Sequence, residues 1–372
     1  MIRKKIHSIN NIFLAWQKAN LNKKNILLVG SNLSPEDESD IKNRLIFYCP
    51  GTSLATSSSF WAYFSRKPVL LSGCTHLINP RMDGIRAGIF NIDSHTNHAD
   101  GWVWSDLAVL CSGKSMDPVL TKKIFSKRIE LLKKEKLSKC YLFGTGPSLG
   151  KADTRDWSDG YRVVCNTIVR NKSLWNHIDP HFIVAGDAIY HFGHTSFAKT
   201  FRQDLALRLA ETDTYFLYPD LFDPIIQREL NEFSERLIPI PVRSRNQLDQ
   251  DLTVTFTLPG LDNVLPLLLL PVGCTLSNNI FLWGFDGRAP DDTLFWSNSV
   301  TESYPELLDE LKKAHPAFFD HFVPREDPYK YVKDVHGDIL ENCLTAAEKN
   351  GFHFTMMHHS WTPVLQKRVN NE

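Results

Sequence analysis

"YLFGTGPSLG", residues 141–150, carries the pattern that decides the fold: an apolar strand that ends in a glycine-rich turn and leads into a helix. Gly144 and Gly146 allow positive φ and let a ligand approach the main chain closely. Pro147 fixes the turn but lacks the N–H that a phosphate would use. Ser148 could cap the following helix, whose free N–H groups favour an anion. The stretch predicts a turn that binds a nucleotide, with a purely structural tight turn as the alternative.

Short apolar runs with longer segments between them continue from this turn to the end of the chain. They predict further strands at 161–167, 180–187, 214–220, 237–242, 279–287 and 352–358. Residues 337–351 predict a helix, because apolar residues recur there at helical spacing and Gly351 is placed to end it. Residues 139–372 therefore predict a doubly wound, mostly parallel Rossmann-like sheet of the α/β class.

The first part of the chain predicts a smaller αβ domain at residues 1–118. Its strand candidates are 25–31, 44–51 and 67–74. A helical connector is expected at 119–138, and the basic cluster at 122–139 predicts a helix with one solvated face. Its apolar positions are Ile124, Phe125, Ile129, Leu131, Leu132 and Leu137. The alternative for this cluster is a surface that meets anionic glycolipid or membrane.

Charge and cysteine content narrow the class of protein. The chain has 42 basic and 42 acidic side chains, and this balance argues against a dedicated nucleic-acid binder. The seven cysteines are dispersed without a CxxC motif, which indicates free thiols in a reducing compartment. The basic N-terminal stretch favours an amphipathic helix over a signal peptide, and the apolar run at 264–274 is too short to span a bilayer. We expect a cytoplasmic protein, with peripheral contact at the inner face of the membrane as a further option.

The candidate site follows from where such sheets bind ligands, which is outside the carboxyl ends of the strands. Asn166 follows one predicted strand and could contact a ribose or a base, or merely form a turn. Asp187 follows the next strand and could orient a sugar hydroxyl, bind a metal or cap the segment after it. Small or polar residues also stand at the other strand ends, at 144–149, 285–287 and 358–360.

The C-terminal part supplies a candidate base. His336 precedes a glycine and a predicted helix, so its imidazole could project into a cleft and take a proton near neutral pH. Tyr329 and Tyr331 could donate hydrogen bonds to a leaving phosphate. The paired carboxylates at 289–293 and the adjacent histidines at 358–359 lack metal-ligand spacing, so no metal site is predicted.

These pieces, in this order, resemble bacterial sialyltransferases of the CMP-sialic-acid type. The resemblance rests on GxGPSL after the first strand, an asparagine after the next, a strand that ends in GFDG and a late His-Gly before a helix. The segment "LFGTGPSLGKAD…VVCNT…IDPHFIVAGD" also resembles the MptE-like family, which includes the motility accessory factors. The resemblance covers residues 139–362 and implies a glycosyltransferase of polysaccharide biosynthesis that uses a CMP-sugar. It also implies that residues 139–372 form a nucleotide-sugar-binding catalytic domain, with a GT-A-like variant of the Rossmann-like sheet.

The resemblance also implies roles for individual residues. His336 would be the general base, Tyr329 or Tyr331 would assist the departing phosphate, and Asp187 could act as a nucleophile instead. Thr145 stands where those sialyltransferases have an asparagine. The nucleotide would lie along the two glycine-containing turns and the asparagine between them, which together comprise Gly144, Thr145, Gly146, Pro147, Ser148, Asn166, Gly284, Phe285, Asp286 and Gly287.

The expected reaction moves a sialic acid-like sugar or Kdo from a CMP-activated donor to a hydroxyl of a cell-surface glycan, glycolipid or glycoprotein. The donor has a single phosphodiester leaving group, so neutral hydrogen-bond donors can suffice and Mg²⁺ is not expected to be essential. No cofactor besides this co-substrate is expected, and inversion or retention stays open.

Two other functions stay open. One is a Mg²⁺-dependent MptE-like pyrophosphokinase on a pterin-type substrate, which needs Asp187, Asp286 and Asp291 to converge. The other is a non-catalytic nucleotide- or glycan-binding protein. A NAD(P)-dependent oxidoreductase is disfavoured, because Asn166 stands where the acidic residue after the second strand is expected.

Overall fold

The computed structural model describes residues 17, 19–30, 33–56, 65–73, 88–112, 117–243, 248, 250–289, 302–322 and 338–369. The chain forms two compact units. The first comprises Met1–Ser115 together with Lys312–His321, and the second comprises Met116–Leu311 together with Phe322–Glu372. The chain therefore leaves the first unit, builds most of the second, and returns to the first for one short segment.

The first unit holds a four-stranded sheet in the order β2-β1-β3-β4, in which every pair is parallel. Its strands are β1 (Asn25–Gly30), β2 (Ser53–Thr56), β3 (Val69–Ser72) and β4 (Ile89–Asn91). Two helices, α2 (Pro35–Tyr48) and α3 (Asp100–Ser112), accompany it, and the buried rings of Tyr48 and Trp104 stack between them with centroids 5.4 Å apart. This is a small α/β unit with its own core, as predicted.

One predicted strand of this unit is wrong. Residues 44–48 of the strand expected at 44–51 form the last turns of α2, and β2 follows only at Ser53. Ser34 starts this helix by accepting a hydrogen bond from Asp37 N, while the Asp37 carboxylate accepts from Ser34 N. Leu45 and Tyr48 then bury one helical face. A capping box far upstream of the apolar run therefore decides its conformation.

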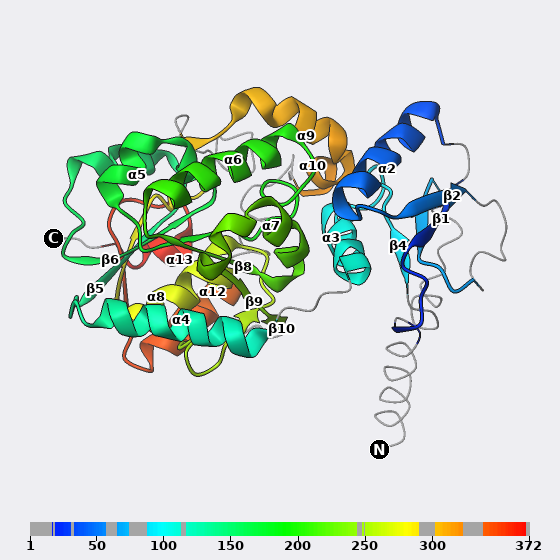
Figure 1. The fold of residues 1–372 in the computed structure, drawn as a ribbon. Coiled ribbons are helices and arrows are strands. Elements are labelled where there is room, and N and C mark those ends of the chain that lie inside the picture. The colour runs from blue at the N-terminus through cyan, green and yellow to red at the C-terminus, as the bar shows by residue number, and fades with distance from the viewer. Residues whose placement is uncertain are drawn as a thin grey trace, which may run out of the picture. The chain divides into compact units, whose positions relative to one another are not determined.

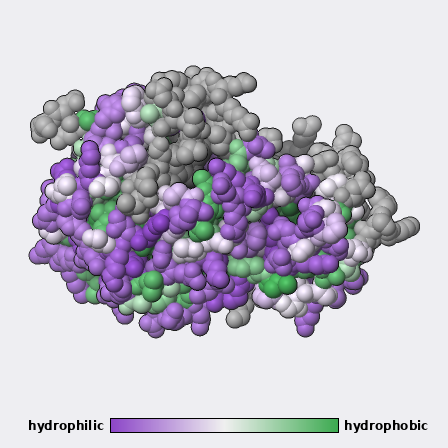
Figure 2. Space-filling model, turned by 90° about the horizontal axis from the view of Figure 1, so that it is seen from above, coloured by the Kyte–Doolittle hydropathy of each residue, from purple (hydrophilic) through white to green (hydrophobic). Residues whose placement is uncertain are grey.

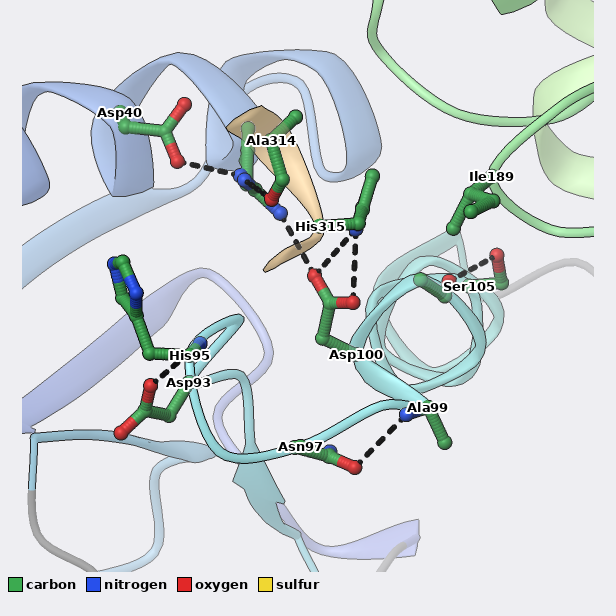
Figure 3. A network of polar contacts seen from close by, with 12 residues as sticks. Asp40, Asp93, His95, Asn97, Ala99, Asp100, Ser105, Ile189, Ala314 and His315 are labelled. Carbon is green, nitrogen blue, oxygen red and sulfur yellow. Dashed lines mark hydrogen bonds and ion pairs between the residues drawn. The ribbon is translucent and has the colours of Figure 1, made fainter. Parts of the chain in front are cut away.

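A buried polar network joins the returning segment to the first unit (Figure 3). His315 donates from Nδ1 to the Asp100 carboxylate at 2.8 Å, and Arg44 donates from Nη1 to the same carboxylate at 2.9 Å. Arg44 also donates to the carbonyl of Ala314 at 2.6 Å. The side chains of Arg44, Asp100 and His315 are at most 3% exposed. The segment is thus an integral part of this unit's interior.

The second unit holds a seven-stranded sheet in the order β13-β12-β5-β6-β7-β8-β9, and all of its pairs are parallel. The central strands are buried on both faces, as expected for a parallel sheet between helices, whereas the two strands on one side begin with exposed residues, Asn279 and His353. The seven strands are β5 (Lys139–Phe143), β6 (Gly160–Cys165), β7 (Phe182–Val184), β8 (Tyr215–Pro219), β9 (Leu237–Ile240), β12 (Asn279–Trp283) and β13 (His353–Met356). This confirms the predicted α/β class with a doubly wound, parallel sheet.

Helices cover both faces of this sheet (Figure 1). The α-helices of this unit include α4 (Pro118–Lys133), α5 (Lys172–Ile178), α6 (Ser196–Glu211), α7 (Asp223–Glu229), α8 (Leu270–Leu276) and α12 (Asp338–Glu348). Further helical elements are η2 (Pro147–Thr154), η3 (Asn166–Arg170), η4 (Asp220–Phe222), η5 (Asn231–Arg236), η8 (Pro305–Leu307) and α13 (Pro363–Gln366). Helix α9 (Leu308–Ala314) leads from this unit into the first, where α10 (Pro316–Phe322) follows.

The segment expected as a connector at 119–138 lies inside the second unit. Helix α4 begins at Asp117, whose carboxylate accepts from Val119 N and Leu120 N, with Pro118 at the first helical position. Phe125, Ile129 and Leu132 join the core of the sheet. Leu131, which the pattern assigned to the apolar set, is 45% exposed.

The proline-interrupted apolar run near 264–274 is buried from Leu265 to Cys274. It forms the π-helical turn η6 (Leu265–Leu269) and then α8, beside a two-stranded sheet of β10 (Val242–Arg243) and β11 (Leu258–Pro259). In the described part of the chain, no helix combines the length and apolar character needed to cross a membrane. The face drawn in Figure 2 is mainly hydrophilic, with hydrophobic residues in small separate spots.

Candidate functional site

The second sheet has one position at which its connections diverge. From β5 the chain winds outward through β6, β7, β8 and β9, and it then returns to place β12 and β13 on the opposite side of β5. The loops after β5 and β12 therefore leave the sheet in opposite directions from neighbouring strands. In open α/β sheets this switch point, at the carboxyl ends of the strands, is where ligands bind.

The two loops at the switch point are in direct contact. Gly144 N donates to Trp283 O and Gly146 N donates to Gly284 O, both at 2.8 Å. A Cβ on Gly144 would lie 2.5 Å from Gly284 O and 2.9 Å from the Phe285 ring. Gly284 has φ +77°, which only glycine adopts without strain. The glycines that predicted a bare turn are therefore required by the neighbouring loop.

Asp286 fills the N-terminal end of helix η2. Its carboxylate accepts from Ser148 N at 3.1 and 3.2 Å and from Ser148 Oγ at 2.5 Å. Gly146 holds the N-cap position and Pro147 the first helical position, so Ser148 lies inside the helix and does not cap it. Thr145 lies between the glycines and is half-buried. The anion that the sequence predicts at this helix end is supplied by the chain itself.

His358, after β13, supports the loop that carries Asp286. Gly284 N donates to His358 Nε2 at 2.9 Å, and His358 Nδ1 donates to His359 O at 2.7 Å. The neutral tautomer with its proton on Nδ1 satisfies both bonds. His358 Nδ1 also lies 4.0 Å from Asp286 Oδ1. Among the described residues, no group of three or more His, Cys, Asp or Glu side chains could hold a metal ion.

The loop beyond Asp286 is locked against the end of the chain. Gly287 has φ +74°, and a Cβ there would lie 2.6 Å from Thr362 Oγ1. Ser360 Oγ donates to Phe285 O at 2.7 Å, and Trp361 N donates to Asp286 O at 2.6 Å. The loop at 284–287 is thus held from both sides, which keeps the Asp286 carboxylate in one place.

Asn166 stands at the end of β6, beside the switch point. Its φ is +54°, in the left-handed region that asparagine tolerates better than most residues. Its side-chain oxygen is buried and has no hydrogen-bond donor in the described part of the chain. A buried acceptor without a donor costs about 1–3 kcal/mol, which a ligand N–H or O–H could recover.

Asp187 stands three residues after β7 and forms a tight turn. Its Oδ1 accepts from Ile189 N at 2.9 Å and from Tyr190 N at 3.1 Å. Burial raises the pKa of Asp187 to about 6, while these two backbone bonds act in the opposite direction. A carboxyl group with that pKa exchanges its proton close to neutral pH.

Two acidic residues at the same edge were not recognised in the sequence. Asp220 and Asp223 follow β8, and burial raises the pKa of each. Asp223 accepts a hydrogen bond from Tyr218 OH at 2.9 Å. The signal was present, because "YPD" at 218–220 ends a predicted strand in the same way as "AGD" at 185–187.

The candidate base and its partners lie outside the described residues. These are His336, Tyr329 and Tyr331, together with Asp291 of the alternative metal-dependent reaction. The described candidates lie in the loops after β5, β6, β7 and β12, at one edge of one sheet.

No family model and no curated protein matches the chain. Among solved structures it matches the sialyltransferase CstII from Campylobacter jejuni in complex with a substrate analogue, CMP-3FNeuAc. That match has a TM-score of 0.30 and 11% sequence identity, and it covers 63% of this chain and 89% of CstII. A likeness of this size has no bearing on function.

Proposed function

We propose that the chain is a glycosyltransferase that moves a nonulosonate-type sugar, sialic acid-like or Kdo, from a CMP-activated donor to a hydroxyl of a cell-surface glycan or glycoprotein. The observation that carries the proposal is the side-chain oxygen of Asn166 beside the switch point, which is buried and has no hydrogen-bond donor among the described residues. A carboxylate on the other side of that point, Asp286, and a carboxyl group with a pKa near 6, Asp187, support it.

The Asn166 oxygen requires a ligand that donates a hydrogen bond. The exocyclic amine of cytosine is such a donor, and so are the ribose hydroxyls. In this proposal the nucleoside of the donor lies over the end of β6 and supplies the missing hydrogen bond. The resemblance to enzymes that use CMP-sugars favours cytidine over other nucleosides.

Asp286 changes the role proposed for the glycine turn. A phosphate placed against Ser148 N would meet the Asp286 carboxylate, which already accepts from that N–H. Two anions at one helix end repel each other. We therefore place the ribose hydroxyls, which can donate to a carboxylate, next to Asp286, and the phosphate farther from η2.

The proposed transfer needs one base. The acceptor hydroxyl oxygen bonds to the anomeric carbon, the bond from that carbon to the phosphate oxygen breaks, and CMP leaves with the electron pair. The hydroxyl proton passes to the base, and a single displacement inverts the anomeric centre. The resemblance gives this role to His336. Asp187, with its pKa of about 6, is the described group that suits the same role.

A thermal-shift panel tests the nucleotide. CMP, CDP, UDP, GDP, ATP and NAD are compared with and without Mg²⁺ at concentrations far above the expected Kd. A ligand at 100 times its Kd stabilises the folded state by about 2.7 kcal/mol. We expect CMP and CDP alone to raise Tm, without any need for Mg²⁺. A preference for ATP with Mg²⁺ would contradict the proposal and favour the pyrophosphokinase.

The Asn166→Ala variant tests the site. It should lower the affinity for CMP by about tenfold, because the ligand then loses its acceptor. Asn350→Ala is the matched control, since Asn350 precedes β13 at the opposite edge of the sheet. Transfer of a CMP-activated sugar to a hydroxyl acceptor should be lost in His336→Ala, with CMP binding retained.

A further inference from the structure

Helix α4 concentrates positive charge in a chain whose overall charge is zero. Between Asp117 and Lys136 the sequence has seven cationic side chains against three acidic ones, Asp117, Glu130 and Glu135. The helix lies along the outside of the second unit, at the lower edge in Figure 1. Nothing in the proposed reaction uses this charge.

The helix presents two distinct faces. Thr121, Phe125, Ile129 and Leu132 are buried and face the sheet. Side chains three or four positions apart share a face of a helix, and one such stripe on the opposite side is exposed throughout. We call it the outer stripe, and it consists of Leu120, Lys123, Lys127, Leu131 and Lys134.

Exposed apolar side chains gather at the same helix. Val119 is 76% exposed, Leu120 54% and Leu131 45%. Val254, 71% exposed, lies beside the first turns of α4, because Lys122 Nζ donates to its carbonyl at 2.9 Å. These four are almost half of the nine exposed large hydrophobic side chains in the part of the chain that the structure describes. Single exposed apolar residues are ordinary, whereas a group set among lysines needs an explanation.

On their own helix the lysines of the outer stripe have one acidic side chain within a turn, Glu130. Lys123, Lys127 and Lys134 form no ion pair with any described residue. Arg128, by contrast, is engaged, since it donates to Asp213 O and lies 4.9 Å from the centre of the Tyr215 ring. The charge of the stripe therefore faces solvent.

We propose that the outer stripe of α4, with Val119 and Val254, is a docking surface for an anionic lipid bilayer. Lysines near such a bilayer are attracted to its headgroups, and their aliphatic stems lie along the boundary with the acyl chains. The valines and leucines between them enter that boundary, as in helices that lie in the plane of a membrane. A soluble polyanion would match the lysines but would leave these apolar side chains in water, which is why we choose lipid.

Vesicle co-sedimentation of the full chain tests this surface. Neutral phosphatidylcholine vesicles are compared with vesicles that contain about one third phosphatidylglycerol, at low and at high salt. The wild-type chain should bind only the anionic vesicles, and about 0.5 M salt should release it, since the Debye length then falls below 5 Å. Lys123→Glu with Lys127→Glu should weaken binding at least tenfold. Val119→Asn with Leu120→Asn should weaken it by a smaller factor.

A matched double variant tests whether binding depends on these lysines or only on the total charge of the protein. Lys199→Glu with Lys349→Glu makes the same charge change at exposed positions of α6 and after α12. It should bind anionic vesicles as the wild type does. Equal loss in both double variants, or no wild-type binding to anionic vesicles, would overturn the proposal. Retention on heparin beads without vesicle binding would also overturn it. Unchanged Tm values establish that the variants fold.

Discussion

Asp187 is a buried carboxyl group, and the pKa of about 6 that burial gives it has a consequence for stability. The folded state binds this proton more tightly than the unfolded state, whose pKa is near 3.8. Ionisation therefore destabilises the fold as pH rises through this range, by about 3 kcal/mol when complete.

Asp187→Asn should remove this dependence. The amide oxygen can still accept from Ile189 N and Tyr190 N, and the side chain stays neutral. Relative to wild type, the variant should gain free energy of unfolding between pH 4 and pH 7, by up to about 3 kcal/mol. Urea titrations at several pH values measure the difference. Asp262→Asn, at an exposed position, is the control for loss of a surface charge. A gain that is constant with pH would contradict the argument.

Gly146 tests whether the glycine turn is required by packing. Its φ of −67° suits any residue, but a Cβ would lie 2.7 Å from Gly284 O and closer still to Asp286 Oδ2. Gly146→Ala should cost about 1–3 kcal/mol of unfolding free energy through overpacking. Asp286→Ala removes the hydrogen bonds to Ser148 and is destabilising by itself. Within that background the cost of Gly146→Ala should be smaller but not zero, because the Gly284 carbonyl remains. Chemical denaturation of the single and double variants measures both effects.

Gly351→Ala separates packing from backbone strain. Gly351 has φ +88° and no atom within 4 Å of a Cβ position. Gly351→Ala should lower the unfolding free energy by about 1 kcal/mol, because an alanine is strained in the left-handed backbone conformation. Asp286→Ala should not change this loss. If Asp286→Ala reduced the cost of both glycine substitutions equally, the requirement for Gly146 could not be explained by its contact with Asp286.

These residues also mark the limit of what the sequence could predict at the site. The local pattern of 141–150 was enough to place the strand, the turn and the helix start. It could not show that Asp286, 138 residues after Ser148, occupies the helix end. Asn166 was correctly placed at a strand end, but its unpartnered oxygen depends on neighbours from elsewhere in the chain.

At the scale of elements, helix α4 shows how far periodicity reaches. The spacing predicted a helix with one buried face, and Phe125 and Ile129 are indeed buried. Leu131 fitted the same apolar set and is exposed, because it lies on the opposite side of the helix from Phe125. The strand prediction at 44–48 was wrong for a different reason, since a short apolar run is compatible with either a strand or a buried helical face.

Phe125→Ala should show that α4 belongs to the core of the second unit. Phe125 is fully buried, with ring centroids 6.0 Å from Phe182 and 5.7 Å from Phe256. Removing the ring should cost about 3–5 kcal/mol of unfolding free energy. Leu131→Ala on the exposed side should change it by about 0.5 kcal/mol or less. Urea denaturation of both variants measures this, and similar costs would contradict the helix orientation.

At the scale of the whole molecule, the first unit depends on a segment that is distant in sequence. Asp100 and Arg44 are buried and hydrogen-bonded to each other, and both also form hydrogen bonds with residues 314–315. His315→Ala leaves the Asp100 carboxylate without one of its donors and should cost this unit about 3 kcal/mol. Hydrogen exchange should accelerate within residues 25–112 and stay unchanged in β5–β9. Exposed His353→Ala is the control, and faster exchange in the second unit instead would contradict the assignment.

The sequence predicted two αβ blocks but not this return. No local pattern at 312–321 distinguishes a segment that completes the first unit from one that continues the second. The decisive contacts join residues more than 200 positions apart, such as His315 with Asp100. Such pairings follow only from the folded chain.

The return of residues 312–321 also has a consequence for how the protein is made. A ribosome releases the N-terminus first, and a domain that is continuous in sequence can fold while the rest is still being synthesised. The first unit cannot do this, because its last piece emerges only after most of the second unit has been made. Until then Arg44 and Asp100 lack His315 and the Ala314 carbonyl. The second unit is completed later still, by residues 322–372, so both units are completed only in the last part of synthesis.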